Sequence, residues 1–334
     1  MRKVVAALGL CLAISCAPKV QTTVLMPANH MEASQIKTVT VLPFTLEDGF
    51  RRSKESVEFA SQVEAALASV IIDGKPYFKL IDRLTINRVI QEQKFNMSGL
   101  VSQDDVAKIG KLVGAKGVYT GVLHPIKKSQ ESYREERIEC RENRCITKYV
   151  RCTTRTLIFS FTPRLVDVET GRVVYSRTIS IDVEDDGCDD TQPAASFEQL
   201  ENHAKRMALE EFIRDVAPYY ITVELELMDS KDNIQSKEDK EKFGSALDFA
   251  EKGRMDRACS MWEEIYERNK NSISLNYNLG ICKELSGKPA EALNFYKKAD
   301  QLTKKPDELI NKALKRASEL LKRQEKLKKQ MGAT

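Results

Sequence analysis

The pattern of hydrophobic and polar residues divides most of the chain into short strands and helices in mixed order. Apolar or alternating stretches predict strands at residues 36–44, 78–81, 118–123, 156–167, 172–183 and 219–227. Apolar residues at helical spacing predict helices at 53–72, 84–90, 102–113 and from Ser196 to a stop at Pro218. We therefore predict an α/β (α+β) domain with a mixed sheet over residues 36–228.

The hairpin at residues 156–183 has a predictable register. Glu169-Thr170-Gly171 is a three-residue turn with glycine last. Odd-numbered positions on both strands are apolar and most even positions are polar. One face of the hairpin is therefore expected to pack on the core and the other to face solvent. Pairing centred on Thr170 places Cys152 opposite Cys188 on the polar face.

The first sixteen residues predict export. Arg2 and Lys3 precede an apolar run that ends at Ser15 and Cys16. The run is shorter than the ~20 residues that a membrane-spanning helix needs, and it fits a signal peptide over residues 1–15. Its end resembles a bacterial lipobox, in which Cys16 becomes lipidated, although the usual leucine stands one place early. An ordinary cleaved signal is the alternative. We expect a lipidated tether at 16–35 and, because no aspartate follows the cysteine, a periplasmic body anchored to the outer membrane.

The six cysteines that remain after export are expected to form disulfides, the default in an oxidising compartment. A loop of four residues joins Cys140 to Cys145, so we predict the pairs Cys140–Cys145 and Cys152–Cys188. A four-cysteine metal site is the alternative. Cys259 and Cys282, on neighbouring repeat helices, are expected to be small buried packing residues, with a bridge between them as the alternative.

Length and charge limit the class of protein. The 334 residues, 42% of them hydrophobic and 31% charged, predict two soluble compact units. The net charge of +4 excludes a strongly basic nucleic-acid binder. Residues 301–334 are locally basic, which indicates either a solvated helix face or contact with anionic lipid or acidic partners.

Several segments, in order, resemble one known family. They are IKTVTVLPF, FKLIDRLTINRVIQEQKFNMSGLVSQDDVAKIGKLVGAKGVYTGVL and PRLVDVETGRVVYS. They look like the curli-secretion (CsgG-type) lipoproteins, whose periplasmic fold is shared with the N-terminal domain of TolB and with penicillin-binding-protein activators. The resemblance covers about residues 35–125 and 155–228. It implies the mixed-sheet fold and an envelope lipoprotein.

Residues 236–304 repeat with a period of 34 residues, which indicates two tetratricopeptide repeats. Small residues where helices cross and an aromatic between neighbouring pairs are the signature, carried by Gly253, Ala258, Trp262, Leu279, Gly280, Gly287, Ala292, Tyr296 and Ala299. An apolar stripe in residues 305–334 predicts a basic helix that caps the repeats.

The family resemblance also raises the question of a pore, because curli-secretion lipoproteins insert hairpins into the outer membrane. The corresponding segment here, 127–155, carries charges at both odd and even positions, so both faces of a strand would be charged. Each buried Lys or Arg costs about 2–4 kcal/mol near the bilayer midplane, so we expect a water-exposed charged insertion and no pore formed by this chain alone.

No pattern predicts catalysis. Only His30, His124 and His203 are present, without the spacing of a metal or catalytic motif, and no phosphate-binding loop occurs. We expect no enzyme, cofactor or metal site. The leading hypothesis is an anchored scaffold that binds envelope proteins through the repeat groove, with a homo-oligomer possible and no nucleic acid. The alternative is an oligomeric outer-membrane component that exports a secreted substrate.

Overall fold

A computed structural model describes residues 18–47, 54–81, 103–141 and 144–332, and they form two compact units. The α/β unit comprises residues 26–219 and 326–334, and the helical unit comprises residues 1–25 and 220–325. The predicted signal peptide, Cys16 and the predicted helix at 84–90 lie outside the described residues.

The sheet of the α/β unit is mixed, as the sequence predicted. Its strand order is β10-β9-β7-β2-β6, with β11 and β8 also paired to β9 and β3 to β7. Pairings of β2 with β6 and β7 are parallel, whereas β8, β10, β11 and β7 are antiparallel to β9. These strands are β2 (Thr38–Val41), β3 (Thr45–Leu46), β6 (Lys79–Leu80), β7 (Gly117–Leu123), β8 (Lys127–Arg141), β9 (Arg144–Asp167), β10 (Val173–Ser176) and β11 (Ile179–Cys188).

Helices cover the sheet where its residues are apolar. The helices of this unit are α1 (Met31–Gln35), α2 (Lys54–Ala68), α4 (Gln103–Val113) and α5 (Phe197–Val216), and a small hairpin pairs β4 (Ile71–Ile72) with β5 (Lys75–Pro76). The predicted capping box opens α5, where Ser196 accepts from the Gln199 backbone and the Gln199 side chain accepts from Ser196. Phenylalanines from α2, β9, α5 and the loop between β2 and β3 form an edge-to-face cluster at the core, made of Phe44, Phe59, Phe159, Phe161 and Phe212.

The predicted tether at 16–35 is wrong for its described part. Lys19–Met26 forms β1, which pairs with β12 (Tyr219–Glu226), and Met31–Gln35 forms α1. The Leu227 amide donates to the Pro18 carbonyl over 2.8 Å, and Lys19 Nζ lies 2.8 Å from Glu224 Oε1. A segment without periodicity is therefore ordered because a strand about two hundred residues away supplies its backbone partners.

The helical unit consists of antiparallel helices packed on the β1–β12 ribbon. Its helices are α6 (Lys237–Glu251), α7 (Met255–Tyr266), α8 (Ile273–Leu285), α9 (Pro289–Leu302) and α10 (Glu308–Met331), whose final residues belong to the α/β unit. Leu225 and Leu227 join its buried core, so β12 belongs here and not to the first domain, where the sequence analysis placed it. Gly253 and Gly287, at φ of +76° and +71°, end the first helix of each pair.

Candidate functional site

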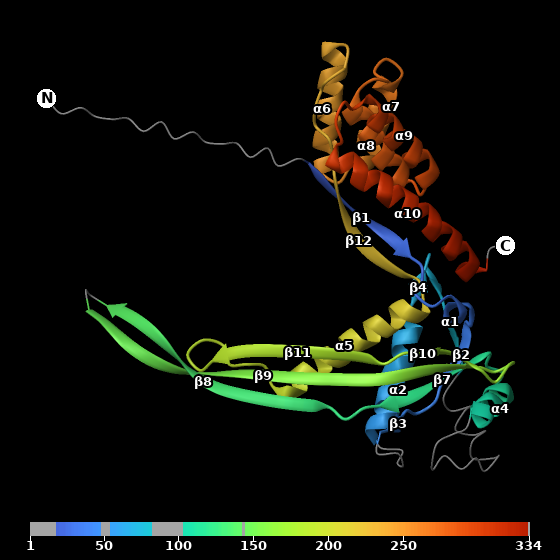
Figure 1. Cartoon of the computed structure of the whole chain (residues 1–334), viewed down its shortest axis with the longest axis vertical. Coiled ribbons are helices and arrows are strands. Elements are labelled where there is room, and N and C mark those ends of the chain that lie inside the picture. The colour runs from blue at the N-terminus through green and yellow to red at the C-terminus, as the bar shows by residue number, and fades with distance from the viewer. Residues whose placement is uncertain (1–17, 48–53, 82–102, 142–143, 333–334) are drawn as a thin grey trace. The chain divides into compact units, whose positions relative to one another are not determined.

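A long hairpin stands out among the described elements because the sequence of its first strand, β8, offers no core-facing side. β8 and the first half of β9 pair directly from Lys127↔Ile158 to Arg141↔Arg144, and β11 runs along the other edge of β9 (Figure 1). We call residues 127–141, 144–158 and 179–190 the arm. We call residues 134–141 and 144–151, where only β8 and β9 pair, the arm tip. The segment predicted as a charged insertion is therefore a regular hairpin.

Two disulfides fix the arm, and both are the predicted pairs. Cys140 and Cys145 face each other near the turn, and Cys152 faces Cys188 where the third strand ends. The register of β11 against β9 is the one predicted from the turn at Thr170, with Ile179 opposite Phe161. Val150, Cys152 and Cys188 form a small buried cluster of their own. The second disulfide thus joins the base of the tip to the three-stranded part.

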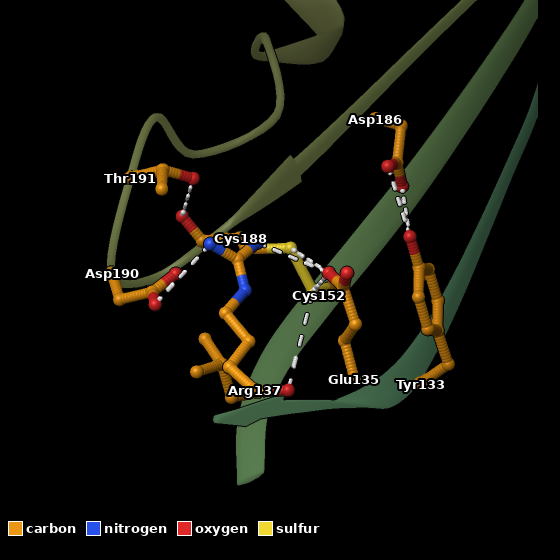
Figure 2. Close-up of polar contacts among 9 residues, drawn as sticks. Tyr133, Glu135, Arg137, Cys152, Asp186, Cys188, Asp190 and Thr191 are labelled. Carbon is orange, nitrogen blue, oxygen red and sulfur yellow. Dashed lines mark hydrogen bonds and ion pairs between the residues drawn. A yellow bond between two sulfur atoms is a disulfide. The ribbon is translucent and has the colours of Figure 1, made fainter. Parts of the chain in front are cut away.

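Charged groups surround the Cys152–Cys188 disulfide (Figure 2). Glu135 Oε2 lies 3.5 Å from Cys152 Sγ and 3.4 Å from Cys188 Sγ. Arg137 Nη2 donates to the same oxygen over 3.1 Å, and its Nη1 lies 3.5 Å from Asp190 Oδ2. The hydrogen bond to Glu135 raises the pKa of the Arg137 guanidinium. Arg137 therefore links β8 to the loop after β11 beside the covalent bond.

Glu135 and the two cysteines are also the residues to consider for the alternative of a metal site. Glu135, Cys152 and Cys188 bring ligand-type atoms within 4.8 Å of one another. Both sulfurs are bonded to each other, so neither is free to bind a cation. Since Cys140 and Cys145 form a separate disulfide, the four cysteines do not converge as a four-cysteine site requires.

One face of the arm's sheet is open and polar. Leu157, Phe159 and Phe161 point to the side that α5 covers and are fully buried. The other face carries the even-numbered residues of β9 and β11, because successive side chains alternate. Exposed acids line it on the outer strands, namely Glu131, Asp182, Glu184 and Asp186.

Hydrogen bonds hold part of this acidic face in place. The Tyr133 hydroxyl donates to Asp186 over 2.9 Å, and the Thr154 hydroxyl donates to the same carboxylate over 2.9 Å (Figure 2 shows the tyrosine contact). Thr156 donates to Glu184 over 3.2 Å. The bond to Asp186 raises the pKa of Tyr133, because it favours the protonated phenol. Asp186 on β11 is therefore held by side chains of the neighbouring strand β9 and of β8, which lies beyond β9.

A second polar cluster lies in the body of the α/β unit, and its role is structural. Asp215, 1% exposed, accepts from the Tyr175 hydroxyl, from Arg177 Nη1 and from Asn29 Nδ2, each over 2.9 Å. Glu211 also pairs with Arg177 at the surface. The carboxylate thus ties the N-terminal segment to α5 and to the β10–β11 connection. The sequence analysis did not identify this cluster, because its members are far apart in the chain.

The three histidines occupy separate places. His30 packs edge-on against Tyr175, with ring centroids 4.9 Å apart. His124 lies between Glu47 and Thr162, at 3.1 and 2.8 Å, and His203 contacts Arg206 on α5. The structure does not bring them together.

Most of the repeat-signature residues lie in the core of the helical unit, whereas Gly253 and Gly287 are exposed in turns. Ala258, Trp262, Ala292, Tyr296 and Ala299 are 0% exposed. Gly280 lies against the Tyr296 ring, where a Cβ would overlap the aromatic carbons. Contrary to expectation, Cys259 and Cys282 form a disulfide, with Cα atoms 5.7 Å apart on α7 and α8. Neighbouring helices at this separation suit a bridge as well as they suit packing.

Side-chain amides hold the backbone at two places that the sequence did not indicate. Asn278 on α8 accepts from the Met228 amide over 2.9 Å and donates to its carbonyl over 2.8 Å. Gln330, 1% exposed near the end of α10, makes the same pair of bonds with Ala28 at 3.0 and 3.1 Å. Each of these side-chain amides makes the two hydrogen bonds that the backbone of a paired β-strand would make. Residues next to Met228 therefore lie along α8 as a bound segment.

The predicted basic capping helix is present as α10. Ile310, Ala313 and Ala317 are fully buried in the core of the helical unit. Arg316 Nε lies 2.9 Å from Glu284 Oε2, which attaches α10 to α8. Within the described residues, no helix combines the length and apolar character needed to cross a membrane.

Comparisons with known proteins match one part of the chain to a family model. A family model described as a domain of unknown function (DUF6340) matches residues 244–329. No curated protein matches the chain. The similar solved structures include the LpoB C-terminal domain from Escherichia coli, with 17% identity, 46% of this chain and 95% of that chain covered, and a TM-score of 0.27.

Two further solved structures are similar to the chain at the same level. Lipoprotein GNA1162 from Neisseria meningitidis is 10% identical, with 52% of this chain and 96% of that chain covered and a TM-score of 0.28. The PelC dodecamer from Paraburkholderia phytofirmans is 13% identical, with 60% and 99% covered and a TM-score of 0.26.

Proposed function

We propose that the chain is a lipid-anchored envelope protein that acts as a non-enzymatic scaffold for other envelope proteins. The short apolar segment that ends at Ser15 and Cys16 supports the anchor, and outer-membrane placement rests on the residue that follows the cysteine. Membership of the curli-secretion lipoprotein family is part of this proposal, because the resemblance rests on sequence segments within the α/β unit.

The helical unit supports a scaffold of two tetratricopeptide repeats. The glycine against Tyr296, the buried alanines and the turn glycines occupy the places that the 34-residue period predicts. In such arrays the first helix of each pair lines the concave face, which is α8 in the second pair. There Asn278 binds Met228 of the same chain. The sequence analysis placed the partner in the repeat groove. Because Met228 already occupies Asn278, we place the partner outside the groove beside α8.

The observation that carries the proposal is the open acidic face of the arm. It lies on three long strands, a disulfide fixes its end, and Asp186 is held by Tyr133 and Thr154. A rigid surface with ordered carboxylates loses little conformational entropy on binding. Its partner is a protein with a complementary basic surface, since opposite potentials steer association and fix register.

Site-specific photo-crosslinking in cells tests the proposal. A photo-crosslinking amino acid at position 182, exposed on the open face, is expected to capture a distinct protein. The same residue at position 248, exposed on α6, is the control and is expected not to capture it. Asp182→Lys should abolish capture from a neighbouring position on the face, whereas Asp248→Lys should not.

Two results would contradict this scaffold. Equal crosslinking from positions 182 and 248 would show that the open face has no dedicated partner. Crosslinks only between copies of the chain, together with detergent-dependent rings and conductance in planar bilayers, would favour the export component instead.

A further inference from the structure

The arm tip exposes apolar side chains more than any other part of the described chain. Among its large hydrophobic residues, Ile138 is 70% exposed, Tyr149 65% and Ile146 61%. The register places Ile138 and Tyr149 on one face of the ribbon as diagonal neighbours, and Ile146 on the opposite face. Both faces of the tip therefore present apolar groups to solvent.

Cations face cations across the tip. Direct cross-strand pairs are Arg134↔Arg151, Arg137↔Lys148 and Arg141↔Arg144. Like charges directly opposite each other destabilise a ribbon in water. Within the described residues, Arg134, Arg144, Lys148 and Arg151 form no ion pair. The Arg134↔Arg151 pair lies on one face of the ribbon, and the other two pairs lie on the opposite face. Positive charge is therefore in excess on both faces.

Acidic residues of the tip stand opposite apolar side chains instead. Glu135 faces Val150, Glu136 faces Tyr149, and Glu139 faces Ile146. The strand from Arg144 to Arg151 thus carries three cations and no acid. The facing cations repel each other in water. Beside a negatively charged surface, each cation is instead attracted by about 1 kcal/mol.

We infer that the arm tip binds the surface of a membrane that contains anionic phospholipids, with its ribbon in the headgroup layer. A protein partner covers one face of a flat ribbon, whereas the headgroup layer surrounds an immersed ribbon on both. Arginine and lysine there reach phosphates, and the tyrosine and isoleucines reach the outer ends of the acyl chains. The tip stays in the headgroups, because its glutamates oppose entry into hydrocarbon. This surface is separate from the open acidic face.

Vesicle co-sedimentation of the full chain tests the inference. The chain is used without residues 1–16, so that neither an acyl chain nor the apolar segment before Cys16 contributes, and is mixed with vesicles of phosphatidylcholine alone or with phosphatidylglycerol. We expect binding to the anionic vesicles only, lost at high salt. The double variant R134Q/R151Q should bind about 25-fold more weakly, from roughly fivefold for each arginine. It should fold, since both side chains are exposed and their removal relieves repulsion.

A matched control separates the tip from the basic helix α10. K315Q/K322Q removes two exposed cations from that helix and should bind within threefold of the parent chain. Y149S should weaken binding without changing net charge. Absence of binding to anionic vesicles, equal losses in the two double variants, or a loss confined to K315Q/K322Q would each overturn the inference. None of these results depends on a protein partner, so the scaffold proposal is tested separately.

Discussion

Replacing Asp215 by alanine should destabilise the α/β unit more than any other single charge removal on α5. The carboxylate is 1% exposed and accepts three hydrogen bonds of 2.9 Å, from Tyr175, Arg177 and Asn29. Its loss leaves the Tyr175 hydroxyl buried without an acceptor, which costs about 1–3 kcal/mol. It also breaks the charge pair with Arg177, which is buried on the Asp215 side alone; for a fully buried pair about 3–5 kcal/mol in total is typical.

The exposed side chain of Arg177 limits this loss. Its side chain is 42% exposed, so water replaces part of what the carboxylate supplied. We therefore expect a loss of about 3–4 kcal/mol in the free energy of unfolding, a large share of the 5–15 kcal/mol usual for a domain. Urea unfolding followed by far-ultraviolet circular dichroism measures the loss. Hydrogen exchange of the α5 and β10 amides assigns it to this unit.

Glu211→Ala is the matched control, because Glu211 pairs with the same arginine at the surface. An exposed ion pair contributes about 0–1 kcal/mol, so this variant should unfold almost as the parent does. A loss below 1 kcal/mol for Asp215→Ala, or equal losses for both variants, would refute the reasoning from burial.

Three further predictions concern the helical unit, and fluorescence of its buried tryptophan during urea unfolding measures each. Hydrogen bonds from Arg268 lower the pKa of the Asp239 carboxyl in the folded protein. The carboxylate therefore stabilises the fold fully above its pKa in the unfolded chain, near 4, and this stabilisation is lost as the pH falls through the lower folded pKa. Asp239→Asn should remove this pH dependence. Gly280→Ala should cost about 1–3 kcal/mol, because its Cβ would overlap the Tyr296 ring, and an unchanged midpoint would contradict the packing described. Asn278→Leu should cost about 1–3 kcal/mol through the unpaired Met228 backbone, and protection of that amide from exchange in the variant would argue against the contact.

Local patterns were sufficient to predict the elements of the α/β unit that hold the arm. The alternation in residues 156–183 and the turn ending in Gly171 fix which residues face each other, because a slip by one residue would turn every apolar side chain outward. The pairing of Cys152 with Cys188 follows from the same register. The charges at both odd and even positions of residues 127–155 likewise predicted that this segment lies outside the core.

Contacts between distant segments could not be predicted in this way. The strand β1 has no alternation, and its partner β12 lies about two hundred residues further along the chain. Asn278 and Gln330 look like ordinary polar residues on helices, and only the backbone that passes beside them gives them a role. The bridge between Cys259 and Cys282 depends on the spacing of two helices, which the repeat period alone does not define.

The pair of bonds between Gln330 and Ala28 has a practical consequence for handling the protein. Ala28 lies twelve residues after the expected point of lipid attachment, and its amide and carbonyl are both satisfied by the fifth residue from the carboxyl end. Loss of Gln330, or a bulky affinity tag inserted beside it, would therefore loosen the stretch around Ala28. Tags belong elsewhere, for instance in the exposed turn at Lys231 and Asp232.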